Sequence, residues 1–245
     1  MPEWLIQNCR LTVFVTPDTI VPSTLWPDII GEQPENSIVQ RATATKTENG
    51  PFGDGTLSLL VQPMRIDWIY QTIPDWTATP TLGPFPAAAE QLLQLSRRWA
   101  KGNTWFPSIS RIALGLVLMY GTPDRSEGYR ELRRFIDGVP NTSDATDFLY
   151  QINRPRSSLT SIGGLQVNRL SKWSVGAYLL GVISMGNTEA SHNMVNSPLQ
   201  THVRLELDIS TSANFQAIIP RESTESVIDD LFKGAQEICE KGNRF

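Results

Sequence analysis

The stretch that most constrains this chain is residues 201–211, where apolar and polar residues alternate without interruption. Its apolar set is Val203, Leu205, Leu207 and Ile209, and its polar set is His202, Arg204, Glu206, Asp208 and Ser210. Successive side chains of a strand point to opposite sides, so the pattern predicts an antiparallel strand with one buried and one solvated face. The polar row holds an imidazole, a guanidinium and two carboxylates. We expect it to form part of any polar working surface.

Composition places the chain among ordinary globular proteins. It has 245 residues, of which 40% are hydrophobic and 19% are charged, enough to bury a core without a metal or a disulfide. The 21 basic and 25 acidic residues give a formal net charge of −4. This balance argues against a dedicated nucleic-acid binder, which needs a basic excess or a strong basic patch.

The two cysteines, Cys9 and Cys239, lie near opposite ends of the chain and cannot form a zinc framework. We interpret both as thiols in a reducing compartment. The first residues lack the basic and apolar regions of a signal peptide, and the longest apolar run, 112–120, is too short to cross a bilayer. These features predict a cytoplasmic protein without membrane contact, and nothing in the sequence calls for a cofactor or a metal.

Strands and helices are both expected. The predicted strands are residues 10–15, 37–47, 56–61, 64–70, 109–120, 148–153, 165–183 as one strand or two, 201–211 and 213–219, with 109–120 buried on both faces beyond Arg111. The predicted amphipathic helices are residues ~86–101, ~125–138 and ~223–240, from apolar residues at helical spacing. The proline-rich segment 17–34 is expected to be irregular, and Trp26 and Trp76 in proline-rich loops are expected to be partly exposed.

The fold class that follows is α+β, with a mainly antiparallel sheet backed by three amphipathic helices. Each half of the chain contains several strands followed by an amphipathic helix. This order favours a single unit over 1–245, built either as one continuous sheet or as two related β-rich lobes, 1–140 and 141–245.

A short echo suggests a binding patch. Residues 151–154 and 166–169 share the form Gln-[Ile/Val]-Asn-Arg and flank a Gly-Gly turn at 163–164. On neighbouring strands they would bring polar and basic groups together, with an aromatic side chain for stacking. The candidate binding residues are Asn153, Arg154, Arg156, Asn168, Arg169, Lys172 and Trp173. A solvated basic hairpin explains the same residues without a ligand.

The histidines offer an alternative. His192 and His202, with Glu206 and Asp208, could serve a hydrolase or nuclease, because imidazoles titrate near neutrality and carboxylates can orient them. A cross-strand ion-pair ladder centred on Arg204 accounts for the same groups.

No nucleophile, phosphate-binding or dinucleotide motif occurs in the sequence. We therefore interpret the chain as a non-catalytic binding or assembly module that acts through a protein partner or through self-association. The enzyme that uses the two histidines is one alternative. A nucleic-acid binder that uses Arg154, Arg156, Arg169 and Lys172 is the other.

Overall fold

The computed structural model describes residues 3–73, 78–102, 104–137, 146–178, 181–183, 194–196 and 200–243. The strands are β1 Leu5–Val15, β2 Asn36–Gln40, β3 Thr45–Phe52, β4 Gly55–Gln62, β5 Arg65–Thr72, β6 Ile109–Thr122, β7 Leu149–Asn153, β8 Arg156–Ser157, β9 Gln166–Tyr178, β10 Gly181–Ile183, β11 Met194–Asn196 and β12 Gln200–Thr211. The α-helices are α1 Leu25–Ile30, α2 Ala87–Gly102, α3 Arg125–Leu132 and α4 Thr224–Lys241, and the short 3-10 helices are η1 Arg41–Thr43 and η2 Arg221–Ser223.

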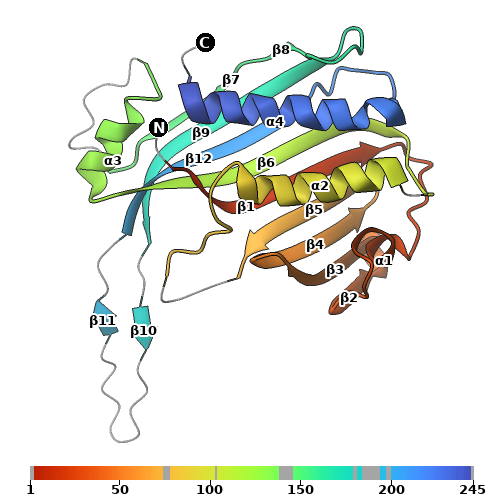
Figure 1. Ribbon diagram of the computed structural model, residues 1–245, viewed down its shortest axis with the longest axis horizontal. Helices are drawn as coiled ribbons and strands as arrows, with labels where there is room; N and C mark the ends of the chain where they lie inside the picture. Colours follow the sequence, from red (N-terminus) through yellow and green to blue (C-terminus); the bar gives the residue numbers. More distant parts are fainter. Residues whose placement is uncertain are drawn as a thin grey trace, which may run out of the picture.

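Ten strands form one antiparallel sheet in the order β2-β3-β4-β5-β1-β6-β12-β9-β7, with β8 also paired to β9. β10 and β11 form a separate two-stranded ribbon. Figure 1 shows the sheet running across the molecule, with α2 and α4 lying along it. The structure confirms the predicted fold class of α+β with a mainly antiparallel sheet backed by helices.

The two halves of the sheet repeat one topology. In the first half, β1 lies beside β5, followed outward by β4 and β3, and the chain then enters α2. In the second half, β6 lies beside β12, followed outward by β9 and β7, and the chain then enters α4. β1 and β6, the first strand of each half, meet at the centre. The sheet is continuous where β1 pairs with β6. Along the chain, the boundary between the two halves falls between α2 and β6, ahead of residue 140. The division into lobes stays a prediction.

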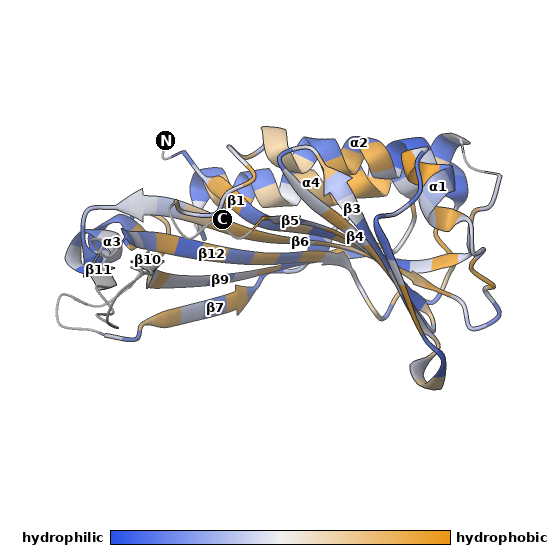
Figure 2. Cartoon of the chain, turned by 90° about the horizontal axis from the view of Figure 1, so that it is seen from below, coloured by the Kyte–Doolittle hydropathy of each residue, from blue (hydrophilic) through white to orange (hydrophobic). Residues whose placement is uncertain are grey.

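The helices cover one face of the sheet. α2 and α4 contact each other and bury apolar stripes, including Leu92 and Trp99 from α2 and Leu231 and Ile238 from α4. Figure 2 shows α1, α2 and α4 on one side of the strands, and no α-helix of the described residues covers the other side. The core therefore lies between the helices and one sheet face, and the opposite face, which no α-helix of the described residues covers, is called the uncovered face below.

The helix boundaries follow the sequence patterns with one exception. α2 and α4 lie within a residue or so of prediction, but α3 is shorter than the predicted ~125–138 and ends at Leu132. Its start agrees with the sequence, because the Asp124 side chain accepts a hydrogen bond from the Glu127 N–H, as a cap does. The helix α1 within the proline-rich segment was not predicted. It buries Trp26 against Gly50, so the expected exposure of Trp26 is wrong. Trp76 lies outside the described residues.

Three strand predictions need correction. The single strand expected over 37–47 is divided into β2 and β3 by η1, after which Ala44 has φ 49°. Residues 213–219 form no strand and contribute one bridge, between Ile109 and Ile219. β6 is not fully buried on both faces, because Gly115 and Val117 are partly exposed on the side without helices.

Candidate binding surface

The polar row of β12 lies on the uncovered face, as its alternation predicts. Val203, Leu205 and Ile209 are fully buried among the helices. Because neighbouring side chains alternate, Arg204, Glu206 and Asp208 point to the other side of the sheet. The strongest pattern in the sequence therefore marks the uncovered face.

Strand register assembles this face into rows that cross the strands. In one row, Arg10 of β1 pairs with Gly115 of β6, Gly115 pairs with Asp208 of β12, and Asp208 pairs with Leu170 of β9. The next row runs Asn8, Val117, Glu206, Lys172 and Gln151. Four strands, β1, β12, β9 and β7, thus place polar residues on this face, and β6 contributes Gly115 and Val117 between them.

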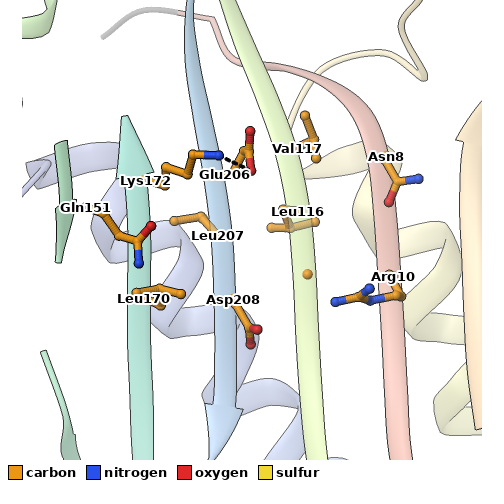
Figure 3. A pocket seen from close by; sticks show the side chains of 11 residues that line it. Asn8, Arg10, Leu116, Val117, Gln151, Leu170, Lys172, Glu206, Leu207 and Asp208 are labelled. Carbon is orange, nitrogen blue, oxygen red and sulfur yellow. Dashed lines mark hydrogen bonds and ion pairs between the residues drawn. The ribbon is translucent and has the colours of Figure 1, made fainter. Parts of the chain in front are cut away.

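These two rows line a hollow of about 410 Å³. Figure 3 shows the side chains of Arg10 and Asp208 extending from β1 and β12 toward the strand between them, β6. The strand residue between them is Gly115. A Cβ atom placed there would lie 3.4 Å from the nearest guanidinium nitrogen of Arg10, so the guanidinium reaches over the glycine. The Arg10 head group therefore lies within van der Waals reach of the position that a side chain would occupy at Gly115.

The charges in the hollow fall into two groups. Glu206 is paired, with Oε1 2.9 Å from Arg204 Nε and Oε2 3.3 Å from Lys172 Nζ. Burial alone would raise the pKa of Glu206, but the hydrogen bonds and charges of Arg204 and Lys172 outweigh it and hold this pKa below its usual range. The ion-pair ladder expected around Arg204 is therefore present only in part, because Arg204 pairs with Glu206 on its own strand, only Lys172 reaches Glu206 across strands, and Asp208 belongs to neither pair.

Arg10 and Asp208 form the second group. Arg10 Nε and Asp208 Oδ1 are buried without a hydrogen-bond partner in the described part of the chain. Nor does either side chain form an ion pair within 4.0 Å there, although only Gly115 separates them in the row. The hollow therefore presents one guanidinium and one carboxylate that the described chain leaves unpaired.

His202 lies apart from these acids. Its ring is buried, stacks on Tyr178 at 4.6 Å between centroids, and has Nδ1 3.5 Å from the Gln200 carbonyl oxygen. Burial lowers its pKa, and the charge of Arg204 lowers it further, while the contact with the Gln200 carbonyl acts in the opposite direction. Glu206 is four residues further along an extended strand, roughly 13 Å away.

These groups therefore do not converge as a catalytic pair. His192 lies outside the described residues. The described residues also hold no group of three or more His, Cys, Asp and Glu side chains suited to a metal ion.

The echoed Gln-[Ile/Val]-Asn-Arg segments meet through their asparagines. Asn153 Nδ2 donates to Asn168 Oδ1 at 3.3 Å, and the Arg169 N–H donates to Asn153 Oδ1 at 2.9 Å. The segments thus lie side by side, but register pairs Asn153 with Leu170 rather than with Asn168. The hydrogen bonds of the two asparagines thus join β7 to β9, and their amide groups bond to each other and to the backbone.

The basic residues of these segments do not form one surface. Arg154 Nε donates to Asn243 Oδ1 at 3.2 Å, Arg156 Nη2 lies 2.6 Å from Asp230 Oδ1, and Arg169 Nη1 lies 3.2 Å from Glu237 Oε2. These three arginines therefore bond to α4 and to Asn243 after it, on the helix side of the sheet.

Lys172 and Trp173 also depart from the expected patch. Lys172 is an odd number of residues from Arg169 on the same strand and points to the uncovered face. Trp173 is fully buried and stacks on Phe135 at 5.2 Å, so it offers no face for a base. The patch expected from the sequence is divided between the two sides of the sheet.

Residues of the hollow that the sequence did not single out include Asn8, Arg10 and Gly115, and Gln151 was noted only as part of the repeated segment 151–154. The available signal was Gly115, an isolated glycine within an apolar strand, which is typical of a close approach by another group. Arg10 needed the pairing of β1 with β6, which no local pattern contains.

No helix within the described residues is both long and apolar enough to cross a membrane. Comparison of the chain with protein-family models, with curated proteins and with solved structures finds no match. The function is therefore inferred from the geometry of the uncovered face.

Proposed function

We propose that this chain is a non-catalytic binding or assembly module and that the uncovered sheet face is its protein-binding surface. The observation that carries the proposal is that Arg10 and Asp208, both in the hollow, have no hydrogen-bond or ion-pair partner among the residues that the structure describes. A partly buried charge without a partner is unfavourable, because it has lost water without gaining a hydrogen bond or counter-charge. A partner surface that supplies the opposite charges would remove this cost, and the paired Glu206 and Lys172 would form a polar rim around the contact.

A protein partner fits the mixed charge better than nucleic acid does. The polyanionic backbone of nucleic acid favours a surface with uncompensated cations. Three of the four cations considered for that role are hydrogen-bonded on the helix side, and the fourth, Lys172, is paired with Glu206. An enzyme that uses His202 with Glu206 and Asp208 is not favoured, because the imidazole is stacked and far from the acids along the strand.

The test is affinity capture with the full chain as bait in an extract of its native host, together with light scattering of the purified protein. The wild type is compared with a double variant, Arg10→Ala with Asp208→Ala. The matched control is Arg97→Ala, which removes an arginine from the helix side, where it pairs with Glu90 and Asp229.

We expect the wild type and the control to form the same stoichiometric complex, with another protein or with itself, and the double variant to lose it. If the wild type forms no such complex, or the double variant retains it in full, this face is not the binding surface.

A further inference from the structure

We propose that the uncovered face binds a second copy of this chain, the two sheets packing face to face about a two-fold axis that runs parallel to β6 above Gly115. The proposal rests on the proposed function, because it names the partner of that same face. It follows from the order of residues on either side of Gly115.

The unpaired charges form a self-complementary arrangement. Arg10 and Asp208 are the residues that pair with Gly115 from its two sides. A two-fold rotation about an axis along β6 exchanges these two sides. Arg10 of each copy then faces Asp208 of the other, so one contact occurs twice, as in every isologous interface. Both groups, which lack a partner among the described residues of one chain, acquire one, and neither meets a like charge.

The next positions outward in the row match as well. Ile69 of β5 pairs with Arg10, and Leu170 of β9 pairs with Asp208. The same rotation places Ile69 opposite Leu170 of the second copy. These side chains are both apolar, and both are partly exposed in the single chain. The two charge pairs would thus be flanked on each side by an apolar contact that helps to exclude water.

The neighbouring row obeys the same symmetry. Val117 lies on the axis and faces its own copy, while Asn8 on one side faces Glu206 from the other. One strand further out, Gln71 faces Lys172. Each contact joins an amide to a charged group, and an amide can donate to a carboxylate or accept from an ammonium. In these two rows no cation opposes a cation and no anion opposes an anion.

The face is large enough for such a dimer. The five strands that the rotation exchanges among themselves, β5, β1, β6, β12 and β9, span roughly 24 Å at the usual strand spacing, and eight residues of each strand span roughly 27 Å. The product is about 650 Å² on each copy, or about 1,300 Å² for the pair, within the range of standard stable interfaces. Aligned face-to-face packing is also an ordinary arrangement for two sheets.

Charge reversal tests the register directly. Arg10→Glu would place a carboxylate opposite Asp208 of the other copy, and Asp208→Arg would place a guanidinium opposite Arg10. Each variant alone should dimerise about 100-fold more weakly than the wild type, because the repulsion occurs twice in every dimer. Neither residue has a hydrogen bond or ion pair in the described chain to lose, so both variants should fold, which circular dichroism checks.

Mixing the two variants is the decisive step. Arg10→Glu carries acids on both sides of Gly115, and Asp208→Arg carries arginines on both sides, so a mixed dimer has only opposite charges in contact. Sedimentation equilibrium should show monomers for each variant alone and a dimer for the equimolar mixture.

A wild type that remains monomeric at about 100 µM overturns the inference, as does a mixture that fails to associate or a single variant that dimerises as well as the wild type. A monomeric wild type that still captures another protein through Arg10 and Asp208 would overturn this inference while leaving the proposed function standing.

Discussion

Loss of the Asp230 carboxylate should destabilise the protein far more than loss of its neighbour Asp229, although both lie on α4 and both pair with arginine. Asp230 Oδ1 lies 2.6 Å from Arg156 Nη2, and its Oδ2 accepts from the Ser158 hydroxyl at 2.7 Å and the Leu159 N–H at 2.9 Å. Its side chain is 2% exposed, against 53% for Asp229. The carboxylate ties the end of the sheet at β8 to the helix α4.

The magnitude follows from what the change leaves behind. Asp230→Ala removes the carboxylate that accepts hydrogen bonds from Arg156, Ser158 and Leu159. It leaves the Arg156 guanidinium, 18% exposed, beside an apolar methyl group. A hydrogen bond to a charged group contributes about 1.5–3 kcal/mol, and breaking a buried pair by removing one partner costs about 3–5 kcal/mol. We expect a loss of about 3–5 kcal/mol for Asp230→Ala. For Asp229→Ala, whose pair with Arg97 is exposed to solvent, we expect less than about 1 kcal/mol.

The assay is urea unfolding at neutral pH, followed by tryptophan fluorescence, with the free energy of unfolding compared among the wild type and both variants. Thermal unfolding gives a second measure, because about 1 kcal/mol shifts the midpoint by roughly 2–4 °C in a chain of this size. Equal losses for the two variants would show that burial does not set the strength of this pair. Replacing both Arg156 and Asp230 by apolar residues should restore much of the loss, since no charge then remains unpaired.

Four further outcomes are expected. Burial raises the pKa of Asp230, but the hydrogen bonds from Arg156, Ser158 and Leu159 lower it by more, so the folded pKa lies below the unfolded value of about 3.8. The carboxylate therefore stabilises the fold above pH ~4, and this stabilisation is lost as pH falls through the folded pKa. The urea midpoint of the wild type should drop more steeply below pH ~4 than that of Asp230→Ala. Burial lowers the pKa of His202, so the neutral ring is favoured in the folded state and stability should fall as pH drops below about 6.5, whereas His202→Gln should flatten this dependence. Burial raises the pKa of Cys9 to about 12, so a thiol reagent should modify it only after unfolding by guanidinium, and rapid labelling of the native protein would contradict this. Gly242→Ala should lower the free energy of unfolding by more than about 2 kcal/mol, because φ of Gly242 is +63° and the new Cβ would clash with the Phe135 backbone oxygen. At Gly102 a new Cβ meets nothing within 4 Å, so Gly102→Ala should leave the urea midpoint unchanged or raise it.

The parts of the fold that depend on local pattern could be predicted from the sequence. The alternation of β12 assigned its two faces correctly, and the apolar spacing of α2 and α4 located both helices. α1 was hidden because it spans only six residues and contains Pro27, which argues against a helix interior. Short helices that are stabilised by one buried side chain, here Trp26, leave little periodic signal.

The candidate surface depends on pairings that no local pattern contains. Arg169 and Trp173 are four residues apart on one strand and therefore point to the same face. Because Trp173 is buried under the helices, Arg169 also points to the helix side. The alternation of side chains along a strand was therefore sufficient to predict that Arg169 and Lys172 lie on opposite faces. The hollow itself required knowing that β1 and β12 both pair with β6, which brings Arg10 close to Asp208 across nearly two hundred residues of sequence.

The central position of β6 has a consequence for folding during synthesis. β1 can pair with β5 as soon as the first half of the chain has emerged, and β6 can then add to the free side of β1. The other edge of β6 has no partner until β12 is made, about 80 residues later, which is roughly 4–16 s at ordinary rates of translation. During this interval the nascent chain carries a long open edge rich in leucine and isoleucine, the kind of template that recruits foreign strands. Slowing translation between Thr122 and Gln200 should therefore increase aggregation, whereas supplying a chaperone that shields exposed strands should counteract it.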